Sequence, residues 1–350
     1  MNKLSCTPQA LYSPFCIIYA AIRLIFLGVI KSRTISSEGK VTNITPESLP
    51  EVKVTLPLKL IFEHEIFANS KCSILELAQL PKIMLGEGTL GSLFKVILNC
   101  GHLVTVRMIR ERLVKPDEME SWINFFAGIR NSLLLPMYCG FWYGGEAFLV
   151  HEYLCIGSLQ ELLHGCEGIQ FTPLSWEVRK HLAKCAAMAV AFMHNQVTKR
   201  GNNLVCGVVK SSNILIRTDF SACLSGYETP YLVPPATIIR RNPGRVAPEL
   251  ASNYQSYPKM FTPKSDVYSF GILLLELITG KRPTITNLGE YVKEKGKREG
   301  LKGICDKKMG EVKEYCVREM IAIAQVCISQ NPKNRPSMDR VVEMLQEIED

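Results

Sequence analysis

The sequence lacks the features that mark several classes of protein. Its 13 cysteines include no CxxC pair and are odd in number, which disfavours a zinc site or a disulfide framework. Most of them, such as Cys185, lie within apolar runs and indicate buried, reduced thiols in a cytosolic domain. Repeats and low-complexity tracts are absent, which excludes solenoids and collagen-like chains. The basic residues behind the formal charge of +8 are scattered and do not alternate with aromatics, so we expect no nucleic acid as a partner.

The chain divides into a strand-rich part followed by a helix-rich part. Apolar and β-branched residues alternate or form short runs at 82–98, 102–109 and 147–153, with helical spacing at 118–130. After residue 155 apolar residues recur at i, i+3 and i+4, in the segments 158–165, 176–196, 264–280 and 316–330. This order predicts an α+β chain with two lobes. With 350 residues, 47% of them hydrophobic, the chain can bury a large core.

The N-terminal region contains a candidate membrane anchor. Residues 11–30 are apolar over the ~20 residues that a membrane helix requires. Lys31 and Arg33 follow directly, so the positive-inside rule places everything downstream in the cytoplasm. Arg23 opposes insertion by roughly 2.5–3.5 kcal/mol, and a cleaved signal peptide or an ordinary buried or amphipathic helix remain alternatives. We therefore predict plasma-membrane association through residues 1–30, or a cytoplasmic protein if they are no anchor.

The remainder of the chain reads as a linker and a folded domain. Residues 31–74 are mixed and polar, include three prolines, and are predicted to be a juxtamembrane linker. The dense pattern of residues 75–350 predicts the domain itself. The sequence shows no extracellular domain before the apolar segment, which favours dependence on a partner and leaves a truncated gene product open.

A glycine-rich motif, GxGxxG, is formed by Gly86, Gly88 and Gly91. A dinucleotide-binding fingerprint has the order strand, glycines, helix. Here the glycines lie between two strand-like runs, which is the order of the hairpin that covers the phosphates of ATP in protein kinases. The motif is weak evidence by itself, because any tight turn uses glycines.

Further motifs follow in a fixed order. They are Val104–Arg107, Glu152-Tyr153, Lys210–Leu215, Ala247–Glu249, Asp266–Gly271 and Asn334–Pro336. This succession over residues 75–350 strongly resembles the protein kinase family, and the segments 264–284 and 331–345 resemble plant leucine-rich-repeat receptor-like kinases. The resemblance implies a bilobal kinase-like fold, with an antiparallel-sheet N-lobe at about 75–152 and a helical C-lobe at about 153–350.

The positions that would hold the phosphates of ATP depart from the family. Arg107 stands where the third strand should carry a lysine, and the planar guanidinium does not replace a point-like ammonium geometrically. The helix glutamate that should pair with this lysine is replaced by Trp122. Glu120 lies two positions away, on another face of the helix. We therefore predict that the lysine–glutamate ion pair is missing.

The positions for proton transfer and metal binding are also replaced. Val208 stands where the aspartate that accepts the substrate proton should be, so the general base is missing. Gly207 replaces the arginine that would meet a phosphate on the activation segment. Gly226 stands in place of the metal-binding aspartate, and Glu228 is displaced from it by two residues. Asp219 reads as an ordinary turn former.

Two further positions concern the adenine pocket that the resemblance implies. Thr105 replaces a small alanine, and His151 occupies the gatekeeper position. Each is interpreted first as a tolerated core substitution, and the alternative is that both, with Arg107, partly fill the pocket. The candidate nucleotide contacts are Gly86, Gly88, Gly91, Arg107, Glu152, Lys210 and Asn213. The residues expected to hold the fold together are Glu249, Asp266 and Arg335.

These replacements predict an inactive receptor-like pseudokinase, which serves as a scaffold or allosteric partner of an active receptor-like kinase or co-receptor. No cofactor is required under this interpretation, and no metal site is expected. One alternative is a nucleotide-binding module that holds ATP weakly without Mg²⁺. The other is a weakly active, atypical Ser/Thr kinase, since positioning alone leaves some rate in crippled enzymes.

Overall fold

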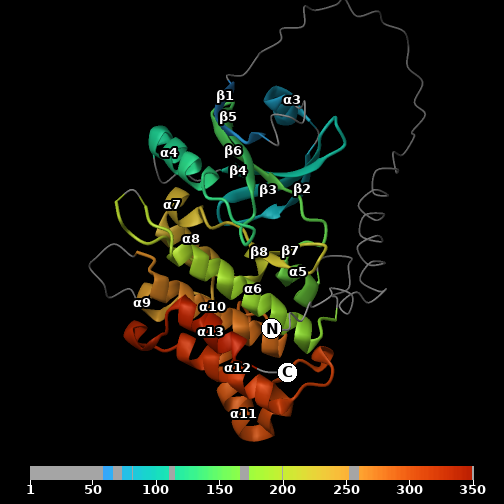
Figure 1. The fold of residues 1–350 in the computed structure, drawn as a ribbon, viewed down its shortest axis with the longest axis vertical. Coiled ribbons are helices and arrows are strands. Elements are labelled where there is room, and N and C mark those ends of the chain that lie inside the picture. The colour runs from blue at the N-terminus through green and yellow to red at the C-terminus, as the bar shows by residue number, and fades with distance from the viewer. Residues whose placement is uncertain are drawn as a thin grey trace, which may run out of the picture. The chain divides into compact units, whose positions relative to one another are not determined.

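An antiparallel sheet of six strands forms the first part of the fold (Figure 1). The computed structural model describes residues 58–65, 73–80, 82–109, 115–165, 173–198, 200–251 and 260–348. The strand order is β1-β5-β6-β4-β3-β2. The strands are β1 (Leu58–Glu63), β2 (Lys82–Glu87), β3 (Gly91–Ile97), β4 (Leu103–Ile109), β5 (Met137–Tyr143) and β6 (Glu146–Glu152).

The sheet begins earlier than residue 75, because β1 lies within the stretch that the sequence suggested to be a linker. β1 pairs with β5, with Leu58 opposite Tyr143. Leu58 and Leu60 on this edge strand are both exposed, while Ile61 and Phe62 at its other end are half-buried. The apolar stretch 11–30 and the rest of the predicted linker up to residue 57 lie outside the described residues.

Two helices accompany the sheet. α3 (Ile74–Gln79) contributes Leu77 to an apolar core that includes Val106 and Phe141 from the strands. α4 (Pro116–Ala127) packs against β1 and β5. It begins with Pro116 and two acidic residues in its first turn, which suit the fixed φ and the positive end of a helix.

The second part of the fold is helical. Its longer helices are α6 (Trp176–His194), α10 (Pro263–Thr279), α11 (Leu288–Ile304), α12 (Glu314–Cys327) and α13 (Met338–Gln346). The shorter ones are α5 (Leu159–His164), α7 (Thr229–Leu232), α8 (Pro235–Arg241) and α9 (Pro248–Ala251), with 3₁₀ turns η2 (Ser211–Asn213), η3 (Lys307–Met309) and η4 (Pro332–Asn334). A two-stranded sheet, β7 (Ile214–Ile216) with β8 (Ala222–Leu224), completes this part.

Helix α10 is the centre of the helical part. Fourteen of its 17 residues are buried, and it packs against α6, α11 and α12. Thr262 caps its start with a capping box, and Gly280 ends it in the left-handed conformation. The predicted α+β fold with a sheet lobe and a helical lobe is confirmed. Within the part of the chain that the structure describes, no helix has the length and apolar character needed to cross a membrane.

Candidate active site

The glycine motif forms the turn between β2 and β3. Gly88 and Gly91 exchange two backbone hydrogen bonds, from Gly88 N to Gly91 O at 2.9 Å and from Gly91 N to Gly88 O at 3.3 Å. The register of the β2–β3 pair shifts between Met84 and Gly86. The turn therefore projects Thr89 beyond the end of the sheet, towards the helical part.

Arg107 on β4 lies close to Glu228, a partner that the sequence did not reveal. Glu228 is 1% exposed and precedes α7. Burial raises the pKa of the Glu228 carboxyl, and the positive charge of Arg107 opposes this shift. Burial lowers the pKa of the Arg107 guanidinium, and Glu228 opposes that shift in turn. The charges of Arg107 and Glu228 thus act on each other, and Glu228 Oε2 has no hydrogen-bond partner among the described residues.

Trp122 on α4 packs into an aromatic cluster. Its ring lies 4.5 Å from that of Tyr231 on α7 and stacks on Phe126 at 5.9 Å. The hydroxyl of Tyr231 accepts a hydrogen bond from the backbone N–H of Val205 at 2.8 Å. Helices α4 and α7 are thereby held side by side (Figure 1). Ring contacts occupy the position of the helix glutamate of an active kinase.

Glu120, the other acid on α4, points to the sheet. Its Oε1 accepts a hydrogen bond from Trp142 Nε1 at 2.9 Å and lies 2.6 Å from Lys59 Nζ. These partners lie on β5 and β1. Glu120 is therefore engaged on the β1–β5 side of α4.

The loop that carries Val208 is held by α10. Asp266 Oδ2 accepts hydrogen bonds from Cys206 N at 2.6 Å and from His194 Nε2 at 3.0 Å. Ser269 Oγ accepts one from the backbone N–H that follows Val208, at 2.8 Å. Val208 is buried and offers no group that could accept a proton.

Gly226, expected from the resemblance to correspond to the metal ligand, lies beside Asn213. Its φ is +72°, and a Cβ there would lie 2.8 Å from Asn213 Nδ2. The backbone N–H of Ser225 donates to the carbonyl of Asn213 at 2.8 Å, which joins the two segments. The residues present do not fit Mg²⁺ as an active kinase holds it, since position 226 offers no carboxylate beside the amide.

Gly207 is crowded in a similar way. Its φ is +83°, and a Cβ would lie 2.6 Å from Pro230 Cγ. A side chain at this position would therefore collide with the start of α7.

The adenine end of the cleft contains an internal hydrogen bond. Thr105 Oγ1 donates to the carbonyl of Glu152 at 3.2 Å and is 3.4 Å from that of His151. These carbonyls belong to the end of β6, where a kinase would meet adenine. Burial, together with the nearby Arg107, lowers the pKa of His151 to about 3, so its imidazole is neutral.

Lys210 connects the glycine turn with the segment after α8. Its Nζ donates to Asn242 Oδ1 at 2.9 Å and to Thr89 Oγ1 at 3.4 Å. Burial and, to a smaller extent, the positive charges of Arg245, Arg107 and Arg241 together lower the pKa of Lys210 to about 8.

Glu249 and Arg335 form a bidentate pair. The distances are 2.7 Å for Nη1–Oε1 and 2.8 Å for Nη2–Oε2. Arg335 is 1% exposed and also donates from Nε to the carbonyl of Ser329 at 2.8 Å. The pair joins α9 to the turn before α13.

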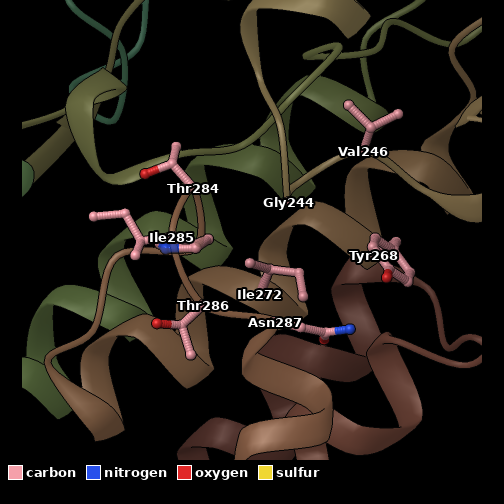
Figure 2. A pocket seen from close by; sticks show the side chains of 9 residues that line it. Gly244, Val246, Tyr268, Ile272, Thr284, Ile285, Thr286 and Asn287 are labelled. Carbon is pink, nitrogen blue, oxygen red and sulfur yellow. The ribbon is translucent and has the colours of Figure 1, made fainter.

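A separate hollow lies at the end of the activation segment (Figure 2). It encloses about 260 Å³ and is lined by Gly244, Val246, Tyr268, Ile272 and the loop 283–287. No predicted nucleotide contact lines it, and its walls carry no ionised side chain.

Comparisons with known proteins extend the picture. Residues 81–345 match the family described as protein tyrosine and serine/threonine kinase. A probable inactive receptor kinase of Arabidopsis thaliana is 31% identical over 297 residues, which cover 81% of this chain. The chain spans 44% of that relative's length.

Two solved structures are similar in fold. The kinase domain of maize SIRK1 (sucrose-induced receptor kinase 1), bound to AMP-PNP, is 26% identical with a TM-score of 0.70, over 83% of this chain and 99% of that one. The pseudokinase domain of BIR2, an immune regulator of the RLK/Pelle family, is 28% identical with a TM-score of 0.63, over 76% of this chain and 80% of that one.

Proposed function

The chain belongs to the protein tyrosine and serine/threonine kinase family, and from this premise we propose that it is a catalytically inactive receptor-like pseudokinase. It acts as a scaffold or allosteric partner of an active receptor-like kinase or co-receptor. The proposal rests on Val208 and Gly226, which offer no carboxylate at the positions where the family resemblance expects the base and the metal ligand.

Phosphoryl transfer depends on positioning and on charge neutralisation, because the protein contributes little covalent chemistry. Val208 supplies no base, and the base alone contributes about 10²–10⁴-fold in rate. The nearest acid to the metal position in sequence, Glu228, faces Arg107. The weakly active kinase is therefore the least supported alternative.

Nucleotide binding is the alternative proposal to a pure scaffold. Lys210, the glycine turn and Asn213 could hold phosphates without Mg²⁺, but Thr105 already donates to the Glu152 carbonyl at the adenine end. Weak, metal-independent ATP binding fits these contacts best. It would serve to stabilise the fold and not to donate a phosphoryl group.

Membrane attachment through residues 11–30, with the kinase-like domain in the cytoplasm, is also proposed. It rests on the apolar stretch followed by Lys31 and Arg33, and on similarity to a receptor kinase. Fractionation of cells that express the chain with residues 11–30 deleted would test it. Unchanged membrane association would contradict the assignment.

The catalytic proposal is tested with the full chain and labelled ATP. We expect no phosphoryl transfer to the chain itself or to a generic substrate, with or without Mg²⁺. Robust transfer that Lys210→Ala abolishes, and that the exposed Lys302→Ala on α11 leaves intact, would overturn the proposal. Thermal melting with saturating ATP adds a second readout, since a ligand at 100 times its Kd stabilises a fold by about 2.7 kcal/mol.

A further inference from the structure

Hydrogen bonds join the glycine turn between β2 and β3 to the end of α8. We propose that Gly88, Thr89, Arg241 and Asn242 form a latch over Lys210, and that a phosphate-bearing ligand enters without a metal only when this latch opens. The inference deepens the proposed function, because it concerns the regulation of the same cleft.

Asn242 is the centre of the latch. It is 3% exposed, and its Oδ1 accepts the hydrogen bond from Lys210 at 2.9 Å. Its Nδ2 donates to the carbonyl of Ile238 at 2.7 Å and lies 3.5 Å from Thr89 Oγ1. One amide therefore fixes the end of α8, the lysine and the tip of the glycine turn.

Arg241 closes the latch from outside. Its Nη1 donates to the carbonyl of Gly88 at 2.9 Å. Gly88 lies so close to Arg107 that a Cβ would be 3.0 Å from its Nη1. The latched turn therefore lies directly over Arg107.

Several positive charges gather beneath the latch. Arg245, Arg107 and Arg241 all act electrostatically on Lys210, and Glu228 acts on Arg107. The Glu276 carboxylate accepts from Arg245 Nη2 at 3.1 and 3.2 Å and also bonds to Ser211 and His164. Lys210 thus lies in a cluster of arginines that favours an anion.

Two further features suit an anion. The side-chain hydrogen-bond acceptors of Lys210 are the neutral oxygens of Thr89 and Asn242. Arg245 Nε is buried and has no hydrogen-bond partner among the described residues. A triphosphate would bring the missing negative charge by itself, and no metal would be needed to neutralise it.

The latch is weak enough to open. Its hydrogen bonds join neutral acceptors, and each contributes only modestly to stability. If a ligand binds only the open state, its apparent Kd equals the intrinsic Kd divided by the fraction of molecules that are open. Loss of one latch contact should therefore strengthen binding about three- to tenfold.

The test measures the affinity of the full chain for ATP in EDTA by calorimetry, for wild type, Asn242→Ala and Thr89→Val, which remove latch contacts and leave every charge of the cluster in place. The control is Arg240→Gln, which changes an exposed arginine of α8 that makes none of the latch hydrogen bonds described above. We expect about three- to tenfold tighter binding for the two latch variants and no change for the control. Inorganic triphosphate should follow the same order, because the charge cluster and not adenine drives entry.

Several results would overturn the latch. One is equal affinity of the wild type and all variants, another is weaker binding by Thr89→Val, and a third is no binding by any variant at millimolar ligand. Hydrogen exchange at Thr89 and Leu90, without ligand, provides a second readout that should accelerate in the latch variants and not in Arg240→Gln. Phosphoryl transfer by the wild type with Mg²⁺ would overturn the pseudokinase proposal and leave these measurements unaffected.

Discussion

Substitutions that look like separate losses in the sequence affect each other in the structure. Arg107 and Glu228 are 121 positions apart, and each alone departs from the pattern of an active kinase. The charge of each opposes the pKa shift that burial causes in the other. Gly226 and Asn213 are related through space, because a Cβ at position 226 would lie 2.8 Å from Asn213 Nδ2. The replaced positions are therefore linked to one another in the folded chain.

Restoring the metal ligand at one position should fail for this reason. Gly226→Asp places a side chain at φ +72° and against Asn213 Nδ2. We expect a loss of about 1–3 kcal/mol in the free energy of unfolding, and no Mg²⁺-dependent ATP binding. Urea unfolding and calorimetry measure the two effects.

The control for that substitution is Gly201→Asp. Gly201 has a similar φ of +77° but no atom within 4 Å of its Cβ position. It isolates the backbone strain from the crowding. If both variants lose the same stability, the contact with Asn213 is not what excludes an acid.

His151 makes stability depend on pH. Its folded pKa of about 3 is below the unfolded value of about 6.5, so the unfolded state binds the proton first. Stability is therefore lost as pH falls below about 6.5. Between pH 7 and pH 5 this residue should account for about 2 kcal/mol of the loss.

His151→Leu should remove that component and flatten the profile, as measured by urea unfolding at both pH values. The exposed His102→Leu serves as the control and should follow the wild type. An unchanged pH dependence in His151→Leu would contradict the assignment.

At the scale of elements, regular patterns were predicted well and contacts between distant segments were not. The helical spacing at 176–196 and 264–280 corresponds to α6 and α10, because each buries a continuous apolar stripe. The kinase family that the ordered motifs indicated is confirmed. Strand β1 was missed although its sequence LKLIFE is mostly apolar, because the polar, proline-containing residues before it made the whole stretch resemble a linker.

The site was predictable only in part. Motif spacing located Arg107, Trp122, Val208 and Gly226, but spacing gives no information on what replaces a missing contact. From the sequence, Trp122 was interpreted only as the replacement of a glutamate. In the structure its ring packs on that of Tyr231, 109 positions later in the chain. The contact between Thr89 and the end of α8 was likewise absent from the sequence interpretation, because α8 carries no motif.

At the scale of the whole molecule, the ion pair between Glu249 and Arg335 joins α9 to the turn before α13. Glu249→Gln would leave the Arg335 guanidinium buried without a counter-charge. We expect a loss of about 2–4 kcal/mol in the free energy of unfolding, reduced from the fully buried case because Glu249 is partly exposed. Urea unfolding measures it.

The control is Glu343→Gln on α13, whose partner Arg340 lies 2.8 Å away on the surface. An exposed pair contributes little, so this variant should unfold like the wild type. Equal losses for the two variants would show that the Glu249–Arg335 pair has no special role in the fold.

The aromatic cluster gives the molecule an optical reporter. The chain has three tryptophans, and the ring of Trp122 on α4 packs against that of Tyr231 on α7. Trp142 hydrogen-bonds within the sheet lobe, and Trp176 begins α6. Fluorescence from Trp122 should therefore change when a partner moves α4 away from the activation segment. A change in Trp122 fluorescence would then report the binding of an allosteric partner, and no enzymatic assay would be needed.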